Sequence, residues 1–168
     1  CLRVSVVNGP FFVLIPRYTH PEMGRLWTEQ RRYEAWLEVE LAAADAMAEV
    51  AIIPSDAARE LRAKARFDIA RIEEIEQTTH HDVIAFTTAV AEHVGEAARY
   101  LHYGLTSSDV VDTALALQMV EACDLTLKNL DGLAEAIRVR ADEHRRTPMI
   151  GRTHGVHAEP MTFGLKLA

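Results

Sequence analysis

Apolar residues recur at the spacing of an α-helix along most of the chain, so the pattern predicts a series of helices. The first expected helix begins at Thr19, where Pro21 occupies the first turn, as is common at helix starts. It continues to about Val50, because Ile53-Pro54 cannot extend it. Its apolar positions are Leu26, Tyr33, Leu37, Leu41, Ala44 and Ala48.

Three shorter helices are expected next, each opened by a residue that commonly caps helices. They cover residues 55–67, 68–80 and 82–100, and they begin at Ser55, Asp68 and Asp82. A short polar loop, LHYGLTSSD, follows at residues 101–109.

The longest expected element is a helix from about Ser107 to about Arg146, which would span roughly 60 Å. Its apolar residues lie on several sides, as in a helix surrounded by others in a bundle. The rest of the chain offers too few long helices to cover it, so partners are expected from an absent C-terminal part or from other subunits. Cys123, within this pattern, is expected to be a core residue.

No strand is expected anywhere, and residues 147–160 are interpreted as a second loop before a new helix that starts at Pro160. The predicted fold class is therefore all-α. A small helical N-terminal domain is expected at residues 15–104, and the start of a long-helix bundle at residues 105–168. Residues 1–14 are an unassigned lead-in.

Composition agrees with a folded protein, because 49% of residues are hydrophobic and 26% are charged. A net charge of -7 argues against a nucleic-acid or anionic membrane surface, which needs a basic footprint. No apolar run reaches membrane-spanning length, and two distant cysteines make no disulfide framework, so a cytoplasmic protein is expected. The chain begins with Cys1 and stops inside an expected helix at Ala168, which predicts a fragment.

Polar residues able to do chemistry gather at four helix ends. Arg17-Tyr18 can contact a phosphate or carboxylate, although such pairs are common and a surface arginine beside a packed tyrosine is the simpler interpretation. Thr78-Thr79-His80-His81-Asp82 lies at a helix start that Asp82 can cap, with solvated histidines as the alternative. Adjacent histidines point in different directions on a helix, which argues against a metal site.

The other two clusters lie at the ends of the longest helix. Thr106, Ser107 and Ser108 place three hydroxyls where free backbone N–H groups and the helix dipole favour an anion, whereas capping needs only one. His154, beside Thr153, lies in a glycine-bounded loop and is a candidate for proton transfer, with a structural turn as the alternative. Neither a phosphate-binding glycine loop nor an HExxH pair is present, and no metal site is expected.

Four segments together resemble the adenylosuccinate lyase family of the fumarase/aspartase superfamily. They are IPRYTHPEMGRLWTEQRRYEAWLEVELA, THHDVIAF, LHYGLTSSDVVDTALALQ and GRTHGVHAEPMTFG, in that order. The resemblance implies a homotetramer with active sites shared between subunits and no cofactor. It also implies β-elimination of fumarate from adenylosuccinate, a nucleotide, and from succinylaminoimidazole carboxamide ribotide.

The same resemblance implies a role for each matching residue. His154 corresponds to the general acid, and Thr153 to a substrate contact beside it. Thr106 and Ser107 correspond to the pair that binds the succinyl portion. The remaining substrate-site positions are Arg17 and Tyr18 at the nucleotide end, and His80, His81, Asp82 and His102. His80 stands where relatives often carry Arg or Lys. The family's general base is a serine in a segment that this sequence lacks, so the chain alone is expected to be inactive.

Two alternatives stay open. The chain could belong to another lyase or cycloisomerase of the superfamily, such as argininosuccinate lyase, fumarase or carboxymuconate cycloisomerase. Its long apolar helix could instead serve a non-catalytic oligomerisation module, in which the polar residues at helix ends would tolerate replacement by alanine.

Overall fold

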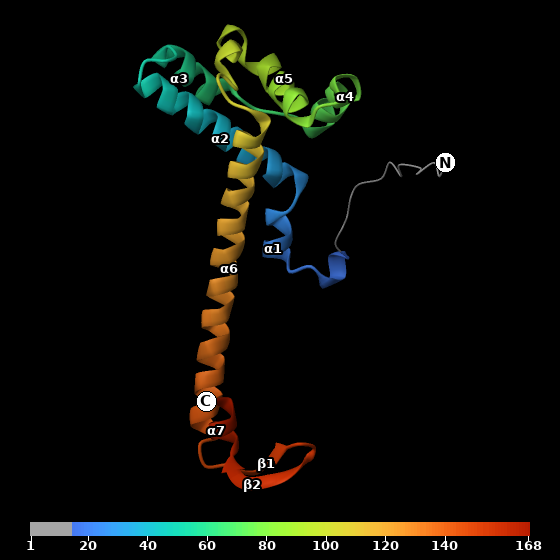
Figure 1. The fold of residues 1–168 in the computed structure, drawn as a ribbon, viewed down its shortest axis with the longest axis vertical. Helices are drawn as coiled ribbons and strands as arrows, with labels where there is room; N and C mark the ends of the chain where they lie inside the picture. The colour runs from blue at the N-terminus through green and yellow to red at the C-terminus, as the bar shows by residue number, and fades with distance from the viewer. Residues whose placement is uncertain (1–14) are drawn as a thin grey trace, which may run out of the picture. The chain divides into compact units, whose positions relative to one another are not determined.

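The computed structural model describes residues 15–168, and the predicted lead-in of residues 1–14 lies outside the described residues. Two compact units divide the chain, one ending at Glu121 and the other comprising Ala122–Ala168. The described residues form seven α-helices, two short 3-10 helices and one two-stranded sheet (Figure 1), which confirms the all-α fold class. The domain boundary predicted between residues 104 and 105 stays a prediction.

The first expected helix is divided in two. A 3-10 turn, η1 (Pro16–Tyr18), precedes α1 (Pro21–Leu26), and α2 (Glu29–Glu49) follows after a break. Thr28 causes the break, because its hydroxyl accepts a hydrogen bond from Arg31 N and starts α2 as an N-cap. The prediction of one continuous helix over this stretch was therefore wrong.

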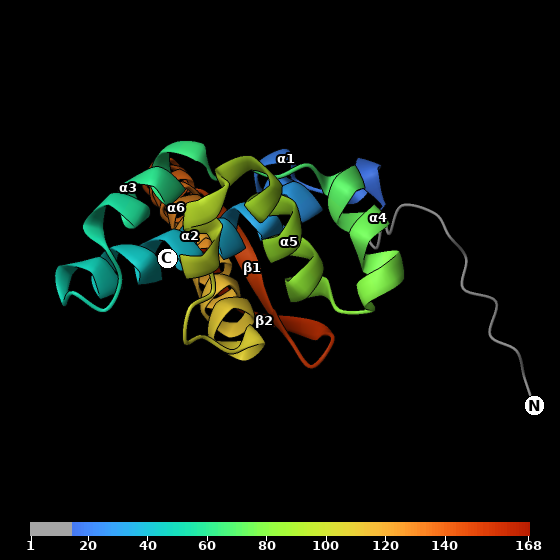
Figure 2. The same cartoon turned by 90° about the horizontal axis from the view of Figure 1, so that it is seen from above.

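The next three helices begin near their predicted starts. They are α3 (Ser55–Lys64), α4 (Ile69–Thr79) and α5 (Asp82–Val94). Asp68 caps α4 as expected, with its Oδ1 2.8 Å from Ala70 N. The last helix is shorter than predicted, because Gly95 adopts a φ of 87° and ends α5 before the 3-10 turn η2 (Glu96–Tyr100). α3 packs on α2, α4 on α5, and η2 contacts both α3 and α5 (Figure 2).

Aromatic side chains fill the core of the first unit. Phe86 is fully buried on α5 and stacks on Tyr33 of α2 with 5.6 Å between ring centroids. The rings of Trp36 and Phe67 also pack edge-on against the Phe86 ring, with centroid distances of 5.5 and 5.9 Å. These rings join α2, α5 and the segment between α3 and α4 into one core.

The long helix α6 (Ser107–Glu143) is anchored in this core by its first turns. Val110 and Ala114 are fully buried. Further along, Gln118 Nε2 donates to the carbonyl oxygen of Leu26 at 2.6 Å, and Glu121 forms an ion pair with Arg31 of α2. That pair lowers the pKa of Glu121, chiefly through the hydrogen bond from Arg31. The start of α6 is therefore held in place against α1 and α2.

Most of the remaining apolar surface of α6 is exposed, in agreement with the prediction of a helix more apolar than this chain can cover. The side chains that are more than a third exposed are Leu115, Met119, Val120, Leu127, Leu130, Leu133, Ile137 and Val139. Cys123 is also exposed, so its prediction as a core residue was wrong for this chain.

The second unit contains a β-hairpin, although no strand was predicted from the sequence. β1 (Pro148–Thr153) pairs antiparallel with β2 (Val156–Thr162), and the register shifts between Ile150 and Arg152. His154 and Gly155 connect the strands with φ angles of 51° and 78°, the signs that a tight type I′ turn requires. The predicted loop at 147–160 is therefore largely a hairpin, and the helix expected from Pro160 begins at Phe163.

The final helix, α7 (Phe163–Leu167), packs closely on the segment at the end of α6. Gly164 N donates to the carbonyl oxygen of His144 at 2.9 Å. A Cβ atom at Gly164 would lie 2.5 Å from the carbonyl oxygen of Ala141, so glycine permits this close approach.

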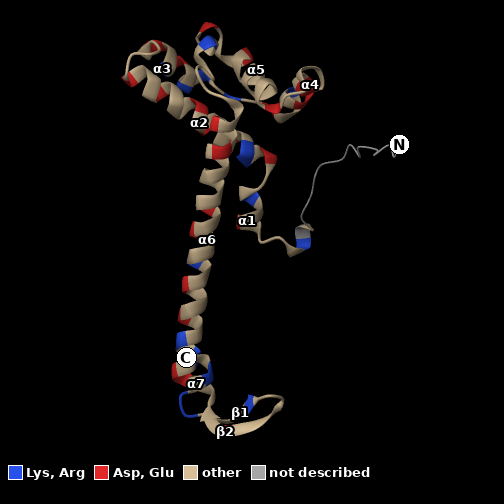
Figure 3. Ribbon diagram, in the orientation of Figure 1, with Lys and Arg blue, Asp and Glu red and all other residues tan. Residues whose placement is uncertain are grey.

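Acidic and basic residues are interspersed along the helices of residues 15–168 (Figure 3). Within the same residues, no helix is both long and apolar enough to cross a membrane.

Replacing Phe86 with alanine is expected to lower the free energy of unfolding by about 3–5 kcal/mol, because a buried aromatic ring leaves a cavity. Thr88→Ala, on the exposed side of the same helix, should change it by less than about 0.5 kcal/mol. Denaturant unfolding followed by circular dichroism measures both variants. Equal losses in the two variants would contradict a core centred on Phe86.

Candidate active site

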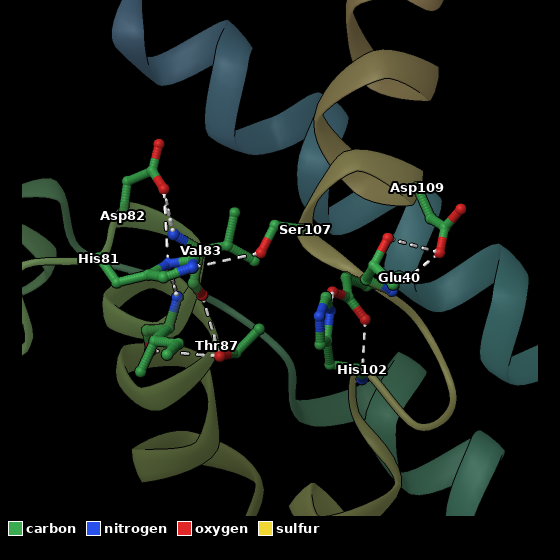
Figure 4. Close-up of polar contacts among 10 residues, drawn as sticks. Glu40, His81, Asp82, Val83, Thr87, His102, Ser107 and Asp109 are labelled. Atoms are coloured by element: carbon green, nitrogen blue, oxygen red, sulfur yellow. Dashed lines mark hydrogen bonds and ion pairs between the residues drawn. The ribbon is translucent and has the colours of Figure 1, made fainter.

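His81 and Ser107, 26 residues apart in sequence, contact each other at the starts of two helices (Figure 4). His81 is the N-cap residue of α5, and its Nδ1 accepts a hydrogen bond from Ile84 N at 3.3 Å. Because Nδ1 accepts, the ring proton of the neutral imidazole lies on Nε2. That nitrogen is 3.4 Å from Ser107 Oγ, so His81 donates to the serine and leaves the hydroxyl hydrogen available to a ligand.

The prediction that Asp82 caps α5 was wrong, because His81 is the N-cap residue and its side chain accepts the capping hydrogen bond. The Asp82 carboxylate accepts instead from Val83 N at 2.8 Å, and it lies 3.6 Å from His81 Nδ1, beyond hydrogen-bond length. His80 ends α4 in the left-handed conformation, with a φ of 49°, and is exposed. The three neighbours therefore occupy one short connection, and His81 is the one of them with a hydrogen bond to Ser107.

Asp109 binds back to Thr106 at the start of α6, as the acidic residue of a capping box does. Both the backbone N–H and the hydroxyl of Thr106 donate to Asp109 Oδ2, at 2.8 and 3.0 Å. These bonds lower the pKa of Asp109, the backbone bond most strongly. The hydroxyl hydrogen of Thr106 is thus already donated to Asp109. The hydroxyl hydrogen of Ser107 has no such acceptor among the described residues. The first N–H groups of a helix also lack an acceptor within the helix.

His102, in the loop before α6, is held by Glu40, a residue that was not predicted from the sequence to belong to the site. Glu40 of α2 has a fully buried side chain, and its Oε2 accepts from His102 N at 2.8 Å. Its Oε1 lies 2.5 Å from His102 Nδ1 (Figure 4). A sequence signal for Glu40 existed, because it shares the helical spacing of Tyr33, Trp36 and Ala44, which are all buried.

Arg17 and Tyr18 lie in η1, where both are exposed. Their side chains contact each other, and Tyr18 N donates to the carbonyl oxygen of Ile15 at 2.9 Å. Arg17 NH2 donates to the Tyr18 hydroxyl at 3.2 Å, and the guanidinium carbon lies 4.7 Å from the ring centroid. The pair therefore presents a cation and an aromatic ring together on the surface.

Thr153 and His154 belong to the second unit, at the tip of the hairpin. Thr153 pairs with Val156, and His154 is the first residue of the connecting turn. Both side chains are exposed. The turn thus places an accessible imidazole at the tip of a two-stranded hairpin, and an accessible imidazole can transfer a proton to a bound molecule.

Within the first unit, the structure groups some of the predicted residues around the start of α6, whereas Arg17 and Tyr18 have no hydrogen bond to it in the described part of the chain. His81 and Ser107 lie in contact (Figure 4). Thr106 and His102 belong to the loop that enters the helix. The helix start can bind an anion through the Ser107 hydroxyl and free N–H groups. No cluster of three or more possible metal ligands occurs in residues 15–168. The catalytic and binding roles themselves stay predictions.

Comparison with known proteins agrees with the resemblance found in the sequence. Adenylosuccinate lyases from Synechocystis sp. (strain ATCC 27184 / PCC 6803 / Kazusa) and Bacillus subtilis (strain 168) are 57% and 54% identical to this chain over 155 residues. Each alignment covers 92% of this chain but 36% of the relative, so the chain spans about a third of the length of these relatives.

Two solved structures share the fold. A fumarate lyase from Mesorhizobium sp. BNC1 aligns with a TM-score of 0.83 and 34% identity over 88% of this chain and 36% of its own. A 3-carboxy-cis,cis-muconate lactonizing enzyme from Pseudomonas putida aligns with a TM-score of 0.79 and 34% identity over 89% of this chain and 36% of its own. A family model described as "Lyase" matches residues 17–168. With nearly all of its length matched by that model, the chain belongs to this lyase family.

Proposed function

We propose that this chain is part of a lyase that cleaves adenylosuccinate to AMP and fumarate by β-elimination. The same enzyme would release fumarate from succinylaminoimidazole carboxamide ribotide. The observation that carries the proposal is the contact between His81 and Ser107 at the start of α6. It orients a hydroxyl donor where a helix N-terminus already favours a carboxylate.

The succinyl portion of the substrate fits this helix start. It carries two carboxylates, and elimination builds further negative charge on the one next to the carbon that loses its proton. Placed donors stabilise such developing charge more than they stabilise the ground state. Ser107 and the free N–H groups of α6 are proposed to bind this carboxylate, and Thr106 to hold the loop in shape through its bonds to Asp109.

His154 is the proposed general acid, which protonates the leaving nitrogen. Its exposed place in the hairpin turn supports this role, because the imidazole is accessible to a bound molecule. Thr153 is proposed to contact the substrate beside it. Arg17 and Tyr18 are proposed to bind the nucleotide end, since an arginine and an aromatic ring suit a phosphate and a base. His80, His81, Asp82 and His102 complete the proposed substrate site.

The general base and the remaining contacts are proposed to come from other parts of a homotetramer whose active sites are shared between subunits. The exposed apolar side chains of α6 support this assembly, because such a surface is stabilised by packing against other helices. No cofactor is included in the proposal, since the reaction needs only proton transfer and charge stabilisation.

Another activity of the superfamily is the second candidate, because the two solved structures are named for fumarate lyase and for a muconate lactonizing enzyme. Their 34% identity is lower than the 48–57% of the adenylosuccinate lyases, which favours the adenylosuccinate branch. Product formation by a full-length lyase that carries these residues, measured on adenylosuccinate, argininosuccinate and 3-carboxy-cis,cis-muconate, separates the candidates. Fumarate release from adenylosuccinate supports the proposal, and activity on either of the other two substrates alone contradicts it.

Ser107→Ala in that lyase is expected to lower kcat/KM roughly 10- to 100-fold, because a hydrogen bond to a charged group contributes about 1.5–3 kcal/mol. Ser108→Ala is the matched control, since it removes the same hydroxyl from the next residue, which is exposed. Steady-state fumarate release measures both. Equal effects of the two substitutions would contradict a specific role for Ser107, and no effect of either would favour a non-catalytic helical module.

His154→Asn is expected to lower kcat by about 10²–10⁴-fold, because asparagine cannot transfer the proton. Asparagine tolerates positive φ, so the hairpin turn should persist, which circular dichroism and thermal unfolding would check. His154→Ala serves as the comparison that also weakens the turn. A His154→Asn variant that keeps most of its kcat would remove His154 from the role of acid.

Mixing the Ser107→Ala and His154→Asn variants tests whether the site is shared. If the two residues in one site come from different subunits, random reassembly gives about one site in four with both residues intact. Fumarate release should then rise well above that of either variant alone after co-refolding. Activity that stays at the level of the separate variants would show that one subunit supplies both residues.

A further inference from the structure

Glu40 is a carboxylate in an apolar core. Its side chain is fully buried on α2, on the same face as the buried Tyr33, Trp36 and Ala44. Burying a carboxylate costs several kcal/mol unless it is paired and hydrogen-bonded. An aliphatic side chain would fill this position without that cost, so the contacts of Glu40 account for its presence.

Both oxygens of Glu40 contact a single residue, His102. Oε2 accepts from the backbone N–H at 2.8 Å, and Oε1 lies 2.5 Å from ring Nδ1. His102 has a φ of 58°, a left-handed backbone that residues other than glycine adopt at a cost. The carboxylate therefore holds the histidine at two points, one on the backbone and one on the ring.

This two-point contact fixes the ring. A carboxylate can only accept, so Nδ1 must carry a proton that it donates to Glu40. Nε2 is then the one ring nitrogen left for another partner, on a side chain that is 25% exposed. The loop that contains His102 continues into Thr106 and Ser107, so this histidine lies in the segment that leads into the start of α6.

We propose that Glu40 is a positioning residue that keeps His102 protonated at Nδ1 and presents Nε2 to the substrate. The role in turnover rests on the proposed lyase function, whereas the state of the ring does not. Glu40 contacts no substrate itself and acts through His102. It resembles the carboxylate that orients the histidine in other acid–base sites, where it fixes the tautomer.

Glu40→Gln gives a specific test of the ring state. The glutamine carbonyl can still accept from the backbone N–H of His102, and its NH2 group then faces Nδ1. An NH2 group donates, so Nδ1 must become an acceptor and lose its proton. Glu40→Asp keeps a carboxylate and should keep Nδ1 protonated.

¹⁵N NMR of a full-length lyase labelled in histidine reads this state, with His102→Asn used to assign the signals of His102. The proposal predicts a protonated Nδ1 in the unmodified protein and in Glu40→Asp, and an unprotonated Nδ1 in Glu40→Gln. An Nδ1 that stays protonated in Glu40→Gln would overturn the proposal. This reading needs no turnover, so it decides the ring state even if adenylosuccinate is not cleaved and the proposed function fails.

Kinetics on the same variants separate positioning from simple support of the fold. Glu40→Gln is expected to lower kcat/KM about tenfold or more, as the loss of a group that orients a histidine does elsewhere. In a His102→Asn background the same change should cause no further loss, because Glu40 acts only through His102. Glu49→Gln, an exposed position at the end of α2, is the control for charge and should match the unmodified enzyme.

Equal losses from Glu40→Gln in both backgrounds would show a structural role and overturn the proposal. So would a reversed ring state with unchanged kcat/KM. Partial recovery of kcat/KM in Glu40→Asp, together with a protonated Nδ1, would support it.

Discussion

The burial of the first turns of α6 against the N-terminal helices is the constraint on which the candidate site depends. Val110 and Ala114 are fully buried, and the ion pair of Arg31 with Glu121 holds the next turns against α2. With the helix fixed in this way, its first residue, Ser107, lies against His81 from a segment 26 residues earlier. The contacts of an ordinary core thus bring separate polar loops together at one helix start.

Around that helix start, Ser107 and His102 each have one polar contact made and one polar group left for a ligand. His81 receives the Ile84 N–H on Nδ1 and donates from Nε2 to Ser107, whose hydrogen is left for a ligand. His102 is engaged by Glu40 through Nδ1 and leaves Nε2. Such partly committed groups are oriented before a substrate arrives, so less ordering is needed at the moment of binding or reaction.

Helical spacing and capping residues predicted much of the fold, because both are local signals. Asp68 opens α4 as expected, and the apolar excess of α6 was visible from its sequence. The break at Thr28 was missed because a cap inside an apolar-periodic stretch resembles a helical threonine. The hairpin was missed because His154-Gly155 is a less familiar turn pair than Asn-Gly, although both residues adopt the required positive φ.

The candidate site was predictable as a set of residues but not as an arrangement. Resemblance to a family supplied the positions of His81 and Ser107, whereas their contact depends on packing between helices far apart in sequence. Glu40 was missed for a related reason. A charged residue on a helix is ordinarily assigned to the solvated face, and only the position of the His102 loop shows why a carboxylate is buried there.

The most direct test of this account is a crystal structure of a full-length lyase that carries these residues, with adenylosuccinate bound to the His154→Asn variant. The account predicts a succinyl carboxylate within hydrogen-bond distance of Ser107 Oγ and the first N–H groups of α6, with His102 Nε2 facing the ligand. A substrate bound with both carboxylates away from the start of α6 would contradict it.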